Sequence, residues 1–112
     1  EALGAFMKDL RGGSSSKDVV VMVFSEFGRR VKQNASQGTD HGTAGNVFLL
    51  GEGLAHPGLF NALPSLNALD DNGDLRFSVD FRSIYVALIE QWLGMPATNI
   101  VPGGIGAPKL FV

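Results

Sequence analysis

Residues 19–24 form an unbroken apolar run, Val-Val-Val-Met-Val-Phe, which restricts the fold more than any other segment of the chain. The run is rich in β-branched side chains, which favour extended backbone, and it does not alternate with polar residues. Strands that are apolar on both faces are typical of parallel sheets covered by helices. The sequence therefore predicts a buried strand in an α/β fold.

Amphipathic segments near both ends of the chain predict the covering helices. Residues 2–10 carry apolar side chains on one helical face, and residues 81–92 carry a longer stripe at helical spacing. In the second segment these are Phe81, Ile84, Tyr85, Leu88, Ile89 and Trp92. A second short strand is predicted at residues 47–50, and Asp70–Asp74 reads as a tight turn. The order helix, strand, loop, strand, turns, helix predicts an α/β layer of few strands, like the edge of a larger sheet.

Composition limits the domain count and the classes of partner. The 112 residues suit one α/β domain, or the C-terminal portion of a larger one, since Glu1 already lies in an expected helix. The net charge of −2 provides no broad basic surface for nucleic acid. No apolar run approaches the ~18 residues of a membrane span. An open sheet edge and an uncovered apolar face lead us to expect self-association.

Asp40 and His41 form the most distinctive pair of candidate ligands. They lie in the polar, glycine-rich segment 27–46, which we interpret as a functional loop between the two strands. Carboxylate oxygen and imidazole nitrogen suit Zn²⁺ or Mn²⁺. Adjacent side chains reach one ion only if the backbone turns, which nearby glycines would permit. The alternative is that Asp40 caps a turn and His41 is a surface residue.

Four further residues are candidates for the same site. His56 follows the second strand and is either a third metal ligand or an exposed histidine. Glu26 follows the first strand, where a carboxylate can bind a cation or act as a base. Arg29 and Arg30 can bind an oxyanion. The alternative is a Glu–Arg ion pair that orders the loop.

Three sequence blocks carry a resemblance to a known family. They are residues 20–30 (VVMVFSEFGRR), residues 38–42 (GTDHG), and Asp80-Phe81-Arg82 at the start of a helix that ends in Trp92-Leu93-Gly94. Together they resemble the C-terminal part of a bacterial family of uncharacterised proteins. That family is similar to the alkaline phosphatase and sulfatase superfamily, which implies a partial three-layer α/β sandwich and an exported or periplasmic protein.

The resemblance also implies roles for individual residues. Asp40 and His41 match two ligands of one ion in a two-metal site. Glu26 and Arg30 occupy positions where the superfamily has ligands of the other ion, although arginine cannot bind a metal. His56 lies near the position of a further histidine ligand in some relatives. The superfamily's nucleophile comes from an N-terminal segment that these residues do not include.

Two functional hypotheses follow from the sequence. The first is the C-terminal segment of a metal-dependent hydrolase of phosphate or sulfate esters, with Zn²⁺ or Mn²⁺ and a small anionic ester as substrate. This segment would be incomplete on its own, because a two-metal hydrolase needs both ions and a nucleophile. The second is a non-catalytic member of the superfamily that acts as a binding or structural module.

Overall fold

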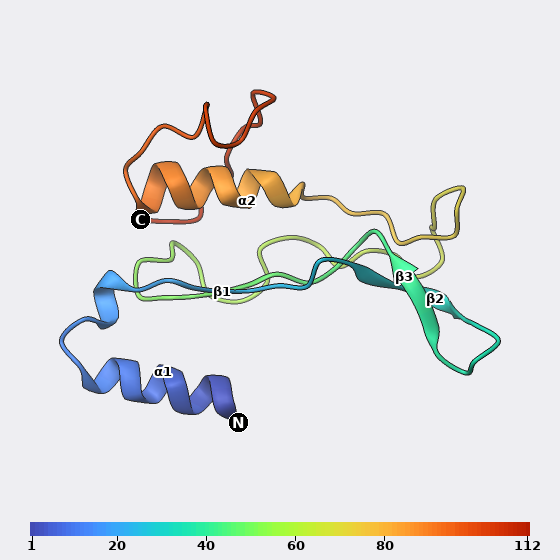
Figure 1. Cartoon of the computed structure of the whole chain (residues 1–112), viewed down its shortest axis with the longest axis horizontal. Coiled ribbons are helices and arrows are strands. Elements are labelled where there is room, and N and C mark those ends of the chain that lie inside the picture. The colour runs from blue at the N-terminus through green and yellow to red at the C-terminus, as the bar shows by residue number, and fades with distance from the viewer.

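Two helices lie on opposite sides of a pair of short strands in the computed structural model, which describes residues 1–112 (Figure 1). Helix α1 (Ala2–Gly12) lies on one side, and helix α2 (Phe81–Ala87) lies on the other. Strands β1 (Val21–Val23) and β4 (Phe48–Leu50) run between them. The fold is therefore mixed α/β with few strands, as the sequence predicts.

The apolar run does contain a strand, but the expected parallel sheet was wrong. Strand β1 pairs antiparallel with β4, and Met22 lies opposite Leu49. Val23 is exposed, so the strand is not covered on both faces. A parallel return needs a long crossover, usually a helix. The chain between β1 and β4 contains no helix, and it returns antiparallel instead.

The segment predicted as a loop contains a second antiparallel sheet, so that interpretation was also wrong. Strands β2 (Gly28–Gln33) and β3 (Thr39–Gly42) form a hairpin that extends away from the two helices (Figure 1). Arg29 lies opposite His41, and the register then shifts before Gln33 meets Thr39. An irregularity of this kind breaks the alternation of side chains that would reveal a strand in the sequence.

Asn34 organises the turn between β2 and β3. Its side-chain Oδ1 accepts hydrogen bonds from the backbone amides of Ser36 and Gly38, both at 3.0 Å. Gln37 adopts a positive φ of 62° within the same turn. Asparagine side chains commonly stabilise turns through such local bonds to the backbone. The turn is thus fixed by one side chain rather than by a hairpin glycine signal.

The C-terminal helix follows the predicted stripe closely. Asp80 caps its start, accepting a hydrogen bond from the backbone amide of Arg82 at 2.9 Å. Helix α2 continues into a π-helical turn, η2 (Leu88–Trp92), and Gly94 ends it with a left-handed φ of 66°. A glycine in this conformation is the usual helix stop. The predicted extent and termination are confirmed.

The C-terminal tail returns along the helix and closes the small core. The amide of Gln91 donates to the carbonyl of Pro108 at 2.7 Å, and its oxygen accepts from the backbone of Leu110 at 3.0 Å. Phe111 is buried and packs against Trp92 with ring centroids 5.4 Å apart. These contacts confirm that the apolar end of the tail lies along the core.

The chain buries little of itself. Only 8 of 112 residues are buried, and the radius of gyration is 16.6 Å, against about 13 Å for a compact domain of this length. The solvent-accessible surface is 8261 Å², whereas a compact monomer of this mass exposes about 6,000 Å². Large apolar side chains therefore lie at the surface. None of the helices has the length and apolar character needed to span a bilayer.

We expect the stability of the fold to fall in acid because of two carboxyls. The side-chain hydrogen bond from Arg82, and then the bond from its backbone amide, lower the pKa of Asp80 below 3.8. The backbone amide of Asp74 lowers the pKa of Asp70 in the same way. A carboxyl whose pKa is lower in the folded state than in the unfolded state stabilises the fold at pH values above its unfolded-state pKa. That stabilisation is lost as the pH falls through its folded-state pKa.

Thermal unfolding at decreasing pH tests this expectation. Tm should fall below about pH 4. The Tm of Asp80→Asn should fall less steeply, because asparagine does not titrate in this range and still caps the helix. Asp71→Asn is the matched control, since Asp71 is an exposed neighbour of Asp70. Equal slopes for Asp80→Asn and the parent chain would contradict the assignment to Asp80.

Candidate functional site

His41 is held at the base of the hairpin by an aromatic stack. Its ring lies on that of Phe27 with centroids 3.5 Å apart and planes 16° from parallel. The guanidinium carbon of Arg29 lies 5.3 Å from the centre of the Phe27 ring. The register of β2 and β3 explains this cluster, because Arg29 and His41 are directly paired. The imidazole is exposed, so its edge is open to solvent.

Asp40 lies next to His41 on β3 but has a different partner. Its Oδ1 accepts a hydrogen bond from Nδ2 of Asn34 at 3.0 Å, at the turn end of the hairpin. The expected backbone turn at the neighbouring glycines is absent: Gly38 and Gly42 have no positive φ. Successive side chains on a strand point to opposite faces. The structure therefore gives the carboxylate and the imidazole separate neighbours.

Arg30 is engaged in an ion pair that the sequence does not indicate. Its Nε and Nη2 donate to the two carboxylate oxygens of Asp74 at 2.9 and 3.3 Å. These hydrogen bonds, and then the attraction of the opposite charges, raise the pKa of Arg30. The alternative Glu–Arg pair was wrong, since Glu26 is exposed and accepts only a long bond, 3.4 Å, from Ser25 Oγ.

Of the two candidate arginines, Arg29 is the one that remains available to a ligand. Its Nη1 donates to the carbonyl of Thr39 at 2.8 Å, which fixes the side chain across the hairpin. The guanidinium is exposed and has no carboxylate partner among the ion pairs of the chain. Arginine presents five N–H donors, so several stay free for an oxyanion.

The candidate metal ligands are not gathered into one cluster. His56 is exposed and lies in the irregular segment after β4. No three histidine, aspartate or glutamate side chains lie close enough together to hold an ion. A catalytic zinc usually takes about three protein ligands and keeps one open position. Asp40 and His41 therefore provide at most part of a ligand set within these residues.

Comparison with protein families identifies the chain. The family model described as "Protein of unknown function (DUF1501)" matches residues 1–71. The chain belongs to this family. Neither the curated proteins nor the solved structures include a match. The family match over residues 1–71 confirms the predicted resemblance to a family of uncharacterised proteins.

The DUF1501 match covers both small sheets and every candidate site residue. Those residues are Glu26, Arg29, Arg30, Asp40, His41 and His56. Asp74, which holds Arg30, and helix α2 lie beyond the matched residues. The hairpin and the candidate ligands therefore fall within the DUF1501 region, whereas Asp74, which anchors the hairpin through Arg30, comes from the rest of the chain.

Sequence reasoning missed three residues that shape the site. Phe27 supports His41, Asn34 binds Asp40, and Asp74 binds Arg30. Phe27 stands inside the Ser-Glu-Phe-Gly block, and Asn34 lies six residues before Asp40, so both carry a local signal. Asp74 is 44 residues from Arg30, and only the three-dimensional structure identifies it.

Proposed function

We propose that this DUF1501 chain supplies two metal ligands and an anion-binding arginine to a metal-dependent hydrolase of phosphate or sulfate esters. The ligands are Asp40 and His41, and the arginine is Arg29. The observation that carries the proposal is the exposed imidazole of His41, which is stacked through its ring face on Phe27. The likeness of the Thr-Asp-His-Gly block to the alkaline phosphatase and sulfatase superfamily supports the same assignment.

The stack suits a metal ligand because it fixes the ring without using its nitrogens. Imidazole binds metals through Nε2 or Nδ1, which lie in the ring plane. Contact with Phe27 through the ring face leaves both edge positions accessible. The bond from Asn34 to Oδ1 of Asp40 leaves Oδ2 as an acceptor. Asp40 and His41 are successive residues of strand β3, so binding of one ion by both requires the strand to turn at Gly42 when the metal binds. In that arrangement imidazole nitrogen and carboxylate oxygen suit Zn²⁺ or Mn²⁺.

Arg29 and Glu26 are assigned the other two roles in the proposed site, binding of the substrate's anionic group and support of the ion or proton transfer. Arg29 lies opposite His41 in the hairpin, so its free donors can hold the anionic group of an ester beside the ion. Glu26 precedes Phe27 and is exposed, which suits a further ligand or a general base. Catalysis by two metals also needs a nucleophile and more ligands. In the proposed site, groups that approach the hairpin from outside these residues supply them.

Metal-dependent thermal unfolding tests the proposal. At a Zn²⁺ or Mn²⁺ concentration of about 100 times Kd, binding should stabilise the fold by about 2.7 kcal/mol. Asp40→Asn and His41→Ala should each weaken or abolish this gain, and EDTA should reverse it. Asp71→Asn removes a carboxylate outside the site and should keep the gain. Stabilisation that persists in the Asp40→Asn, His41→Ala double variant would contradict the proposal.

A second function, a non-catalytic binding or structural module, is favoured by the ion pair between Arg30 and Asp74. That pair uses Arg30 to anchor the hairpin rather than to bind substrate. This alternative predicts no stoichiometric metal and an unchanged fold after Asp40→Ala. Hydrolysis of an aryl phosphate or sulfate that disappears with His41→Ala would rule it out.

A further inference from the structure

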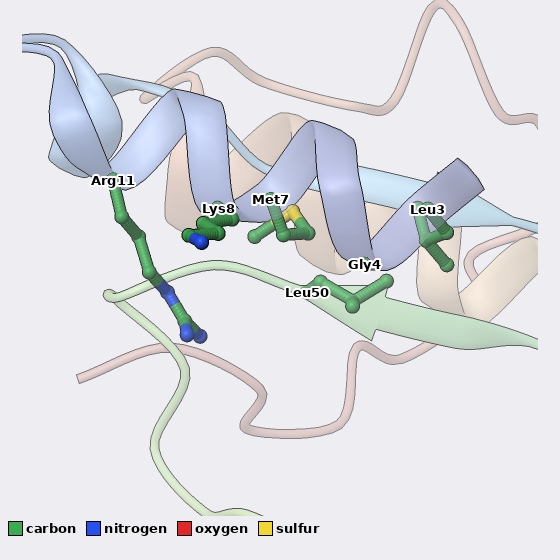
Figure 2. Close-up of a pocket in the computed structure, with 6 residues that line it drawn as sticks. All are labelled: Leu3, Gly4, Met7, Lys8, Arg11 and Leu50. Atoms are coloured by element: carbon green, nitrogen blue, oxygen red, sulfur yellow. The ribbon is translucent and has the colours of Figure 1, made fainter. Parts of the chain in front are cut away.

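A hollow of about 340 Å³ lies between helix α1 and strand β4 (Figure 2). Helix α1 lies far from the β2–β3 hairpin (Figure 1). Its lining is Leu3, Gly4, Met7, Lys8, Arg11 and Leu50. Ligand sites in proteins are commonly about 300–1,000 Å³ in volume. Met7 is 8% exposed and contributes to an apolar inner surface together with Leu3 and Leu50.

Gly4 leaves its part of the hollow open. A Cβ atom at this position would meet no other atom within 4 Å. Glycine is among the least favourable residues in the interior of a helix, and Gly4 lies inside α1. Gly4 lines the hollow and has open space around it, so a larger side chain at this position would occupy that space.

Two cations border the apolar surface. Lys8 and Arg11 are three residues apart on α1 and line the hollow together with Met7, whereas an amphipathic helix usually places its charges opposite its apolar face. Neither forms an ion pair, since the ion pairs of the chain are Arg30–Asp74 and Arg82–Asp80. Arg11 extends from α1 toward the chain that follows Leu50 (Figure 2).

We propose that this hollow binds a small amphipathic anion, a carboxylate joined to an alkyl chain. The alkyl chain would lie against Leu3, Met7 and Leu50, beneath Gly4. The carboxylate would be bound by Arg11, whose planar guanidinium matches its two oxygens, with Lys8 as a second positive charge. The site is separate from Asp40 and His41, so its test does not depend on metal binding.

An NMR titration of the 112-residue chain with octanoate tests the binding. With methionine methyl groups labelled, the Met7 signal should shift with saturation, and the signal of exposed Met95 should not. Octan-1-ol has the chain without the charge, and acetate has the charge without the chain. Both should bind about tenfold more weakly than octanoate. Equal affinity for octanol would overturn the role of Lys8 and Arg11.

Two substitutions with matched controls locate the ligand. Gly4→Leu fills the hollow while improving helix propensity, and it should abolish saturable binding. Gly12→Leu, at an equally open position at the end of α1, should leave binding unchanged. Arg11→Gln should raise Kd about tenfold, and Lys17→Gln, which removes an equal charge outside the hollow, should not.

A last comparison separates a small ligand from a lipid surface. Vesicles that contain an anionic lipid present the same charge and alkyl chemistry to α1. The proposal requires octanoate binding that Gly4→Leu abolishes in the absence of vesicles. Unaltered octanoate binding by Gly4→Leu, or association with vesicles alone, would overturn it.

Discussion

Gly28→Ala is expected to disrupt the β2–β3 hairpin and to cause the largest loss of stability of any Gly→Ala substitution in the chain. A Cβ atom at Gly28 would lie 1.6 Å from the carbonyl oxygen of Ala44 and 2.3 Å from its carbonyl carbon. Both are backbone atoms, so no side-chain rotation relieves the overlap. Gly28 is buried and pairs with Gly42, whose own Cβ would lie 2.9 Å from the backbone of Arg29.

Urea unfolding should report this loss. We expect the free energy of unfolding to decrease by at least about 3 kcal/mol. The overlap forces Gly28 and Ala44 apart, which breaks the strand pairing that supports His41. Gly38→Ala is the matched control: its Cβ would stand 3.7 Å from Asn34, an ordinary contact. It should change the free energy of unfolding by less than about 1 kcal/mol. Similar values for both variants would contradict the packing at Gly28.

Asp74→Ala is expected to release the hairpin from the turn at residues 70–75. Asp74 is 6% exposed, and both of its carboxylate oxygens accept bonds from Arg30. Asp74→Ala removes both charge-assisted hydrogen bonds, which are stronger than neutral ones, while the Arg30 side chain, 35% exposed, stays in contact with water. The remaining side-chain bond between hairpin and turn is from Thr43 Oγ1 to the carbonyl of Leu75, at 3.0 Å.

Thermal unfolding and a double-mutant cycle measure this contact. Asp74→Ala should lower Tm by about 5 °C or more, whereas Asp71→Ala, at an exposed position of the same turn, should have little effect. Arg30→Gln alone should also destabilise, and the double variant should lose less than the sum. Additive losses would show that the two side chains do not stabilise the fold through each other.

The sequence predicted the elements that depend on local chemistry. The apolar stripe at residues 81–92, with Asp80 before it and Gly94 after it, predicted a helix that forms as expected, because capping and periodicity act within a few residues. The turn at Asp70–Asp74 also forms: the backbone amide of Asp70 bonds to the carbonyl of Asp74 at 2.9 Å. Gly73 adopts a positive φ of 82° there.

Some features of the candidate site depend on local sequence, and others depend on contacts between distant residues. The adjacency of Asp40 and His41 was visible in the sequence, as was the possibility of an oxyanion site at Arg29 or Arg30. Which arginine stays free depends on Asp74, which contacts Arg30 across 44 residues. Local patterns carry no signal for such a partner. The carboxylate and imidazole likewise gained separate neighbours because the segment forms a strand rather than a turn.

The sequence by itself determined the α/β content, the C-terminal helix and its ends, the acidic turn, and the resemblance to a family of uncharacterised proteins. Tertiary structure alone decided the antiparallel pairing of β1 with β4, the hairpin of β2 and β3, and the partner of Arg30. The physical reason is the separation along the chain between the groups that interact. Helix caps and turns are set by bonds between near neighbours, whereas strand partners and ion pairs depend on which distant backbone can approach, as Gly28 does against Ala44.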